Sequence, residues 1–254
     1  MVKIIKNVIC LFLMFQFFSS LSSGAEPDTL RIIDVSELSE GKIPAKWKHI
    51  LPRKQLIYTN YSLEWDREGP YLRALSGGTG SWLELELEDI DVSKYPVMEW
   101  LWKVNQFPET GWEKDASQDD FPIRIELVYD YKGGKTLLNM VRKGIFTSIF
   151  KGYPPELIVS YVWSLNVPFE ESYQSPNSKR TMILPIESDI ALKERWIHER
   201  RIIKDDLEIF NIEKTPLVLR KIRIRADTDD SSTLSESAIK YICLIGGEDE
   251  TVDY

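Results

Sequence analysis

Apolar and polar residues alternate along most of this chain, with the two-residue period of half-buried β-strands. The alternation is clearest in residues 97–104 and 123–131, which flank a polar loop that contains Trp112 and several aspartates. Further strands are expected at residues 30–35, 57–65, 71–76, 81–88, 157–165, 180–186, 217–226 and 238–245. The pattern therefore predicts about ten short strands.

Two segments depart from this alternation. Residues 135–150 repeat apolar side chains at a spacing near 3.6 residues, which predicts a helix, and residues 196–210 combine a strand with a short helix over 204–210. No internal repeat or linker divides the chain. The sequence thus predicts a mostly β fold, a single antiparallel β-sandwich over residues 26–254 with one or two short helices. The acidic tail at 247–254 is expected to be loose.

The amino end has the order of a secretory signal peptide. Lys3 and Lys6 precede the apolar run 8–18, and small polar residues lead to a plausible cleavage point after Ala25. A retained membrane anchor is the rival interpretation, but it would need roughly 20 apolar residues. We therefore expect residues 1–25 to be removed, leaving an exported periplasmic or extracellular protein without a stable membrane span.

The charge of the exported chain limits the classes of partner that it is expected to bind. Without residues 1–25 it has 30 basic and 40 acidic residues, a net charge of −10. Nucleic-acid binding depends on a basic face, so no nucleic-acid partner is expected. Cys243 is the one cysteine left after cleavage, which excludes an intramolecular disulfide.

Tryptophans and aspartates are the candidate binding groups. An exposed aromatic ring can stack on the apolar face of a sugar, while Asp and Arg side chains bond its hydroxyl groups. The alternative is that the strand tryptophans fill the core and the aspartates cap turns. The candidate ligand-binding residues are Trp102, Trp112, Asp119, Asp120, Arg124, Trp163, Asp227 and Asp229.

Metal and ion-pair chemistry gives further alternatives. Asp227 and Asp229 begin like a calcium loop, but no glycine follows, which excludes a helix–loop–helix site and leaves a structural calcium of the sandwich type. No other cofactor is expected. Arg124 is expected to form a partly buried ion pair with Asp120.

From about residue 47 to residue 245 the chain resembles a bacterial family known as domain of unknown function 3047. The matching pieces, in family order, are Tyr95-Pro96, Trp100-x-Trp102, Asp119-Asp120-Phe121-Pro122-x-Arg124, Tyr161-x-Trp163, Trp196, Asp206 with Phe210, and Asp227-Thr228-Asp229. Leu101 departs from the pattern, since a basic residue is usual there. The resemblance implies an exported jelly-roll or galactose-binding-like sandwich and brings no agreed activity.

The sequence therefore predicts a non-catalytic exported domain that binds a carbohydrate or another envelope component. A glycan-acting hydrolase or lyase that uses the Asp loops is the first alternative, because such enzymes need a pair of carboxylates. A periplasmic protein–protein scaffold is the second, and it would show a large apolar surface patch.

Overall fold

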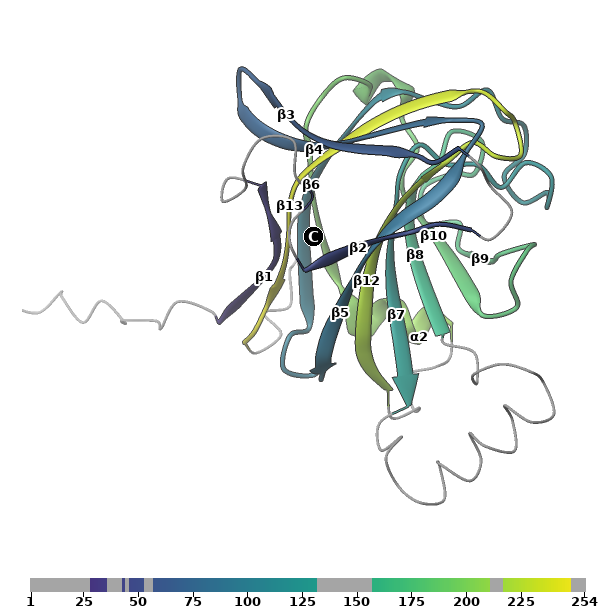
Figure 1. The fold of residues 1–254 in the computed structure, drawn as a ribbon. Helices are drawn as coiled ribbons and strands as arrows, with labels where there is room; N and C mark the ends of the chain where they lie inside the picture. The colour runs from purple at the N-terminus through teal and green to yellow at the C-terminus, as the bar shows by residue number, and fades with distance from the viewer. Residues whose placement is uncertain are drawn as a thin grey trace, which may run out of the picture.

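Two β-sheets pack face to face in the computed structural model, which describes residues 28–35, 43, 46–52, 57–131, 157–210 and 217–247 (Figure 1). The six-stranded sheet contains β1 (Thr29–Asp34), β3 (Asn60–Asp66), β4 (Gly69–Gly77), β6 (Val97–Gln106), β11 (Ile197–Ile202) and β13 (Leu234–Ile245). The seven-stranded sheet contains β2 (Trp47–Ile50), β5 (Gly80–Ile90), β7 (Arg124–Tyr131), β8 (Leu157–Trp163), β9 (Tyr173–Gln174), β10 (Thr181–Glu187) and β12 (Leu217–Asp227).

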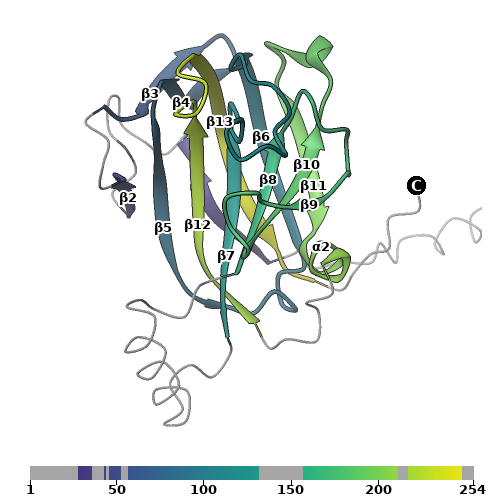
Figure 2. The same ribbon diagram turned by 90° about the vertical axis from the view of Figure 1, so that its right-hand side faces the viewer.

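The strand order confirms the predicted β-sandwich. The smaller sheet runs β11-β6-β13-β4-β3, with β1 also paired to β13, and the larger runs β2-β5-β12-β7-β8-β10-β9. Figure 2 shows β5, β12, β7 and β8 of the larger sheet side by side. Among the described strands, β8 and β10 form a parallel pair, which differs from the all-antiparallel expectation.

Element boundaries agree with the sequence pattern where they can be compared. The short helix expected at 204–210 is α2 (Ile203–Ile209). No helix among the described residues is long and apolar enough to cross a membrane. The predicted signal peptide, the helix at 135–150 and the tail after Gly247 lie outside the described residues.

Aromatic side chains fill the space between the sheets. Trp100 and Trp102 from β6 are fully buried, as are Tyr161 and Trp163 from β8 in the opposite sheet. Trp100 stacks on Tyr161 with ring centroids 5.4 Å apart, and Trp102 lies 5.8 Å from Trp163. Rings of this size dominate core stability because each buries a large apolar area.

A bulge in β12 decides which side chains face the core. The pairing register shifts between Leu219 and Lys221 against both β5 and β7. Leu219 therefore points into the core, although strict alternation would place it on the same face as Lys221 and Arg223. The bulge leaves Arg223 and Arg225 on the outer face of the seven-stranded sheet, opposite the buried Ile222 and Ile224.

One carboxylate faces the interior at the edge strand β11. Glu199 pairs across the ladder with Trp100, and Trp102 Nε1 donates a hydrogen bond of 3.2 Å to Glu199 Oε1. Burial, together with repulsion from Glu187, raises the pKa of Glu199 to about 7. The ionised form of this side chain therefore destabilises the sandwich.

We expect the Glu199→Gln variant to be more stable than the wild type at pH 8, because glutamine keeps the acceptor for Trp102 without the charge. An acid whose pKa is raised in the folded state binds more protons there than in the unfolded state, so wild-type stability falls as pH rises from 4.5 to about 7. The expected gain above pH 7 is on the order of 2 kcal/mol. Denaturant unfolding near pH 5 and pH 8 measures it, and parallel pH profiles for the two proteins would contradict the assignment.

Candidate functional site

A pocket of about 400 Å³ opens on the outer face of the seven-stranded sheet, the side away from the core. We call it the outer-sheet pocket. Its floor comes from β5, β12 and β7. Its walls come from the loop before β7, the loop before β10 and the loop after β12. The floor side chains are Trp82, Arg124, Glu126, Arg223 and Arg225, and the wall side chains include Asp119, Asn177, Asp229 and Asp230.

Strand register arranges the floor in rows of opposite charge. Arg223 of β12 lies between Glu84 of β5 and Glu126 of β7 in the ladder. Its Nε is 2.7 Å from Glu84 Oε2, and its Nη1 is 3.8 Å from Glu126 Oε2. Opposite charges placed directly across strands stabilise a sheet, so this row is held in a fixed arrangement.

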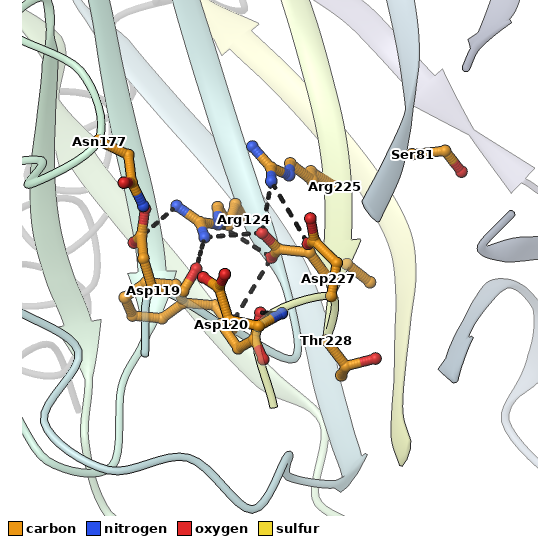
Figure 3. Close-up of polar contacts among 12 residues, drawn as sticks. Ser81, Asp119, Asp120, Arg124, Asn177, Arg225, Asp227 and Thr228 are labelled. Carbon is orange, nitrogen blue, oxygen red and sulfur yellow. Dashed lines mark hydrogen bonds and ion pairs between the residues drawn. The ribbon is translucent and has the colours of Figure 1, made fainter. Parts of the chain in front are cut away.

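The next row places two arginines side by side. Arg225 lies across from Trp82 on one side and Arg124 on the other. The fully buried Asp227 offsets this repulsion, because its Oδ2 is 2.8 Å from Arg124 Nη2 and 2.7 Å from Arg225 Nη2 (Figure 3). Burial lowers the pKa of Arg124, but Asp119, Asp227 and Glu126 outweigh it and raise that pKa above its ordinary value.

Loops are tied to this charged centre by backbone contacts. Arg124 Nη2 also donates to the carbonyl oxygen of Asp119, and Asn177 Nδ2 donates to Asp119 Oδ2 at 3.2 Å. Asp120 accepts from the backbone nitrogens of Asp230 and Ser231, at 3.2 and 2.6 Å. The loops before β7, before β10 and after β12 are therefore fixed to one another at the pocket wall.

Two exposed carboxylates form the rim beside Asp227. Burial and the neighbouring Asp227 carboxylate raise the pKa of Asp229, and burial together with Asp120 and Asp229 raises that of Asp230. Asp229 packs closely against Gly80, where an added Cβ would meet Asp229 Oδ1 at 2.5 Å. The glycine thus allows the carboxylate to approach the start of β5, two residues before Trp82.

Carboxylate oxygens of Asp120, Asp227 and Asp229 lie within 4.8 Å of one another and are the described residues that could hold a metal. Calcium takes six to eight oxygen ligands, so three carboxylates would need further oxygens from backbone or water. Arg225 already contacts Asp227 and competes for the same oxygen. The calcium expected from sequence stays a prediction, and this triad is the place to which it applies.

The structure brings together five of the eight candidate residues from sequence. Asp119, Arg124 and Asp229 line the pocket, and Asp120 and Asp227 lie buried in contact with its walls and floor. The expected pair of Arg124 with Asp120 is not formed among the described contacts. Arg124 pairs with Asp119 and Asp227 instead, because the β7–β12 ladder puts Asp227 beside it.

The three candidate tryptophans lie in different parts of the structure, and none of them lines the pocket. Trp102 and Trp163 are 0% exposed and belong to the core, which corrects their assignment as ligand-binding residues: each sits on the inward face of its strand. Trp112 is 50% exposed on the loop before β7, as expected, but does not line the pocket. Lys114 Nζ lies 5.4 Å from its ring centroid.

Sequence reasoning missed several pocket residues although it contained a signal for them. Trp82 alternates with Glu84 and Glu86 on the polar face of its strand, which is an unusual place for a tryptophan. Arg223 and Arg225 lie two residues apart and form a basic row on their own strand. An aromatic residue on one polar face and a basic row on another would have identified the pocket only if β5 and β12 had been known to pair.

A family profile described as "Protein of unknown function (DUF3047)" matches residues 45–243. The chain belongs to this family. The match confirms the resemblance seen in the sequence motifs and includes every candidate residue of the site. No curated protein matches this DUF3047 chain.

Solved structures similar to this DUF3047 chain include carbohydrate-binding modules. The family 11 module of the cellulosomal cellulase Lic26A-Cel5E of Clostridium thermocellum has 11% identity and a TM-score of 0.43, with 87% of this chain and 95% of the module covered. The module CBM28, described as specific for non-crystalline cellulose, has 13% identity and a TM-score of 0.39, with 80% and 87% covered. The xylan-binding module CBM15 has 9% identity and a TM-score of 0.31, with 87% and 97% covered. These values carry no ligand over to this chain.

The Asp227→Asn variant is expected to lose about 3 kcal/mol of unfolding free energy. The change removes the carboxylate that holds Arg124 and Arg225 together and leaves two like charges opposed on neighbouring strands. Glu86→Gln is the control, because its pair with Lys48 is more than half exposed on both sides and is worth less than about 1 kcal/mol. Denaturant unfolding of both variants measures the difference, and equal losses would contradict the role given to Asp227.

Calcium is expected to raise the melting temperature relative to chelator, because a cation at the triad would relieve the repulsion among its carboxylates. Asp229→Asn should abolish that rise by removing one ligand. Differential scanning fluorimetry measures both effects. A melting temperature that does not respond to calcium would remove the structural calcium.

Proposed function

We propose that this DUF3047 protein is a non-catalytic β-sandwich that binds a carbohydrate in the outer-sheet pocket. The observation that supports it is the composition of the pocket floor. Trp82 offers half-buried apolar surface next to guanidinium donors and carboxylate acceptors that alternate from strand to strand. Sites for small ligands commonly combine an apolar wall with a few convergent polar groups.

Sugar hydroxyl groups suit this floor because each can donate one hydrogen bond and accept others. Arg223 and Glu126 present a donor and an acceptor side by side on neighbouring strands of the lining. Vicinal hydroxyl groups on a sugar ring need such an alternation. Asn177, which contains both kinds of group, adds to it from the wall.

The pocket is also preorganised. Arg124 and Arg223 are held by carboxylates, and the walls are anchored by Asp119 and Asp120. Side chains that are already ordered lose little conformational freedom when a ligand binds, so more of the contact energy appears as affinity. The order of these side chains therefore supports ligand binding with little loss of conformational entropy in the pocket.

We infer that the protein is exported after removal of residues 1–25 and meets its carbohydrate in the periplasm or outside the cell. The signal-like order of the first residues supports this location. The acidic net charge of the chain is compatible with an envelope polysaccharide and unfavourable for nucleic acid.

A glycan-acting hydrolase or lyase is the second candidate, and the raised pKa values of Asp229 and Asp230 favour it. A carboxyl group with a raised pKa can act as a general acid. The other lining carboxylates are ion-paired, Asp119 to Arg124 and Glu126 to Arg223, which makes them poor partners for such an acid. Release of reducing ends from an oligosaccharide would distinguish this candidate from binding alone.

Trp82→Ala is expected to weaken carbohydrate binding by about tenfold or more, because it removes the apolar wall of the pocket. Trp112→Ala is the matched control, since that ring is exposed but lies outside the pocket lining. Calorimetric titration of the protein and both variants with neutral oligosaccharides from envelope polysaccharides gives the affinities. Equal affinities for Trp82→Ala and the wild type would move the site away from this pocket. Absence of binding to every sugar would refute the proposal in favour of a protein scaffold.

A further inference from the structure

We propose that the outer-sheet pocket prefers a sugar that carries a protonated amine over the matching neutral sugar, and that it rejects sugar carboxylates. This inference rests on the proposed carbohydrate binding and specifies its ligand. It follows from the charge balance of the pocket, from the position of its unbalanced charge at the rim, and from the contact of the rim residue Asp229 with Gly80, two residues before Trp82 on β5.

Every arginine that lines the pocket is already engaged by a protein carboxylate. Arg124 and Arg225 share Asp227, and Arg223 is bound by Glu84 at 2.7 Å. A sugar carboxylate would have to compete with these contacts for its cation. The floor therefore does not supply the bidentate guanidinium site by which proteins usually recognise carboxylates.

The lining has more negative than positive groups. Its carboxylates are Asp119, Glu126, Asp229 and Asp230, against the guanidinium groups of Arg124, Arg223 and Arg225. The buried Asp120 and Asp227 add two further acids directly behind the rim. In a partly enclosed site such an excess attracts cations and repels anions more strongly than it would in bulk water.

The excess is concentrated at the rim. Asp230 has no ion-pair partner among the described residues, and its carboxylate experiences the charges of Asp120, Asp229, Asp119 and Asp227. Crowded carboxylates of this kind are stabilised by an added ammonium group, which relieves their mutual repulsion and donates up to three hydrogen bonds to their oxygens. The rim of the pocket thus matches a protonated amine in both charge and hydrogen bonding.

The rim also adjoins the aromatic wall. Asp229 lies against Gly80, and Trp82 follows two residues later on β5. Both Trp82 and Asp229 line the same pocket. One sugar residue can therefore contact the indole with its ring and the aspartates with an amine substituent. This juxtaposition distinguishes an amino sugar from a small free cation, which would gain nothing from Trp82.

The test compares three oligosaccharides of equal length: β-1,4-linked glucosamine, β-1,4-linked glucose and α-1,4-linked galacturonate. Calorimetric titrations of the full chain at pH 6 in the presence of chelator give the three affinities. We expect glucosamine to bind about tenfold more tightly than glucose, and galacturonate to bind most weakly. Equal affinities for glucosamine and glucose would overturn the inference while leaving carbohydrate binding intact. Failure of all three to bind would overturn both.

Two variants locate the effect within the pocket. Asp230→Asn is expected to reduce the glucosamine-to-glucose ratio of affinities at least about threefold, because it removes the rim charge that lacks a cation. Glu86→Gln removes one negative charge from the same sheet, outside the pocket lining, and should leave the ratio unchanged. A preference that persists in Asp230→Asn, or that falls equally in Glu86→Gln, would show general attraction to an acidic protein and overturn the inference. Melting temperatures confirm that both variants are folded.

Discussion

The buried carboxylate of Asp227 is the interaction on which the outer-sheet pocket depends. It ends β12, bonds Arg124 on one side and Arg225 on the other, and its backbone nitrogen donates to the carbonyl oxygen of Phe121 at 3.2 Å. Without it, two guanidinium groups would face each other across the β7–β12 ladder. Desolvating a buried charge network of this kind costs free energy. In return, the network fixes one arrangement of strands and loops.

The same strand joins the hydrophobic core to the pocket. β12 packs Ile222 and Ile224 between the sheets and turns Arg223 and Arg225 outward. Its bulge lets Leu219 also face inward, so the strand keeps an apolar inner side along its length while its outer side carries the basic row. Core packing therefore sets the positions of the arginines on the outer face, and these positions do not depend on a ligand.

The sequence predicted the sandwich and most of its strands because alternation is a local property. Alternation groups Trp100 with Trp102, and Ile125 with Leu127, on one face of each strand, and all four are in the core, although Trp102 was expected to bind ligand. The pocket was predicted only in part, because it depends on which strands are neighbours. Trp82 and Arg225 are far apart in sequence, and nothing local shows that they pair. The β12 bulge could not be predicted either, because one extra residue changes the pairing register of a strand without changing the kind of residues in it.

The parallel pairing of β8 with β10 has a consequence for the shape of the binding surface. A tight hairpin can return only an antiparallel neighbour, so the chain from Ser164 to Arg180 must travel the length of the sheet before β10 begins. That connection places Ser175, Asn177 and Ser178 in the pocket lining. The wall on this side is the turn at the end of that connection, which joins β9 to β10, an antiparallel pair at the edge of the sheet. Its length can therefore vary between relatives, changing the depth and reach of the pocket, while the ladders beneath it and the charges on the floor stay as they are.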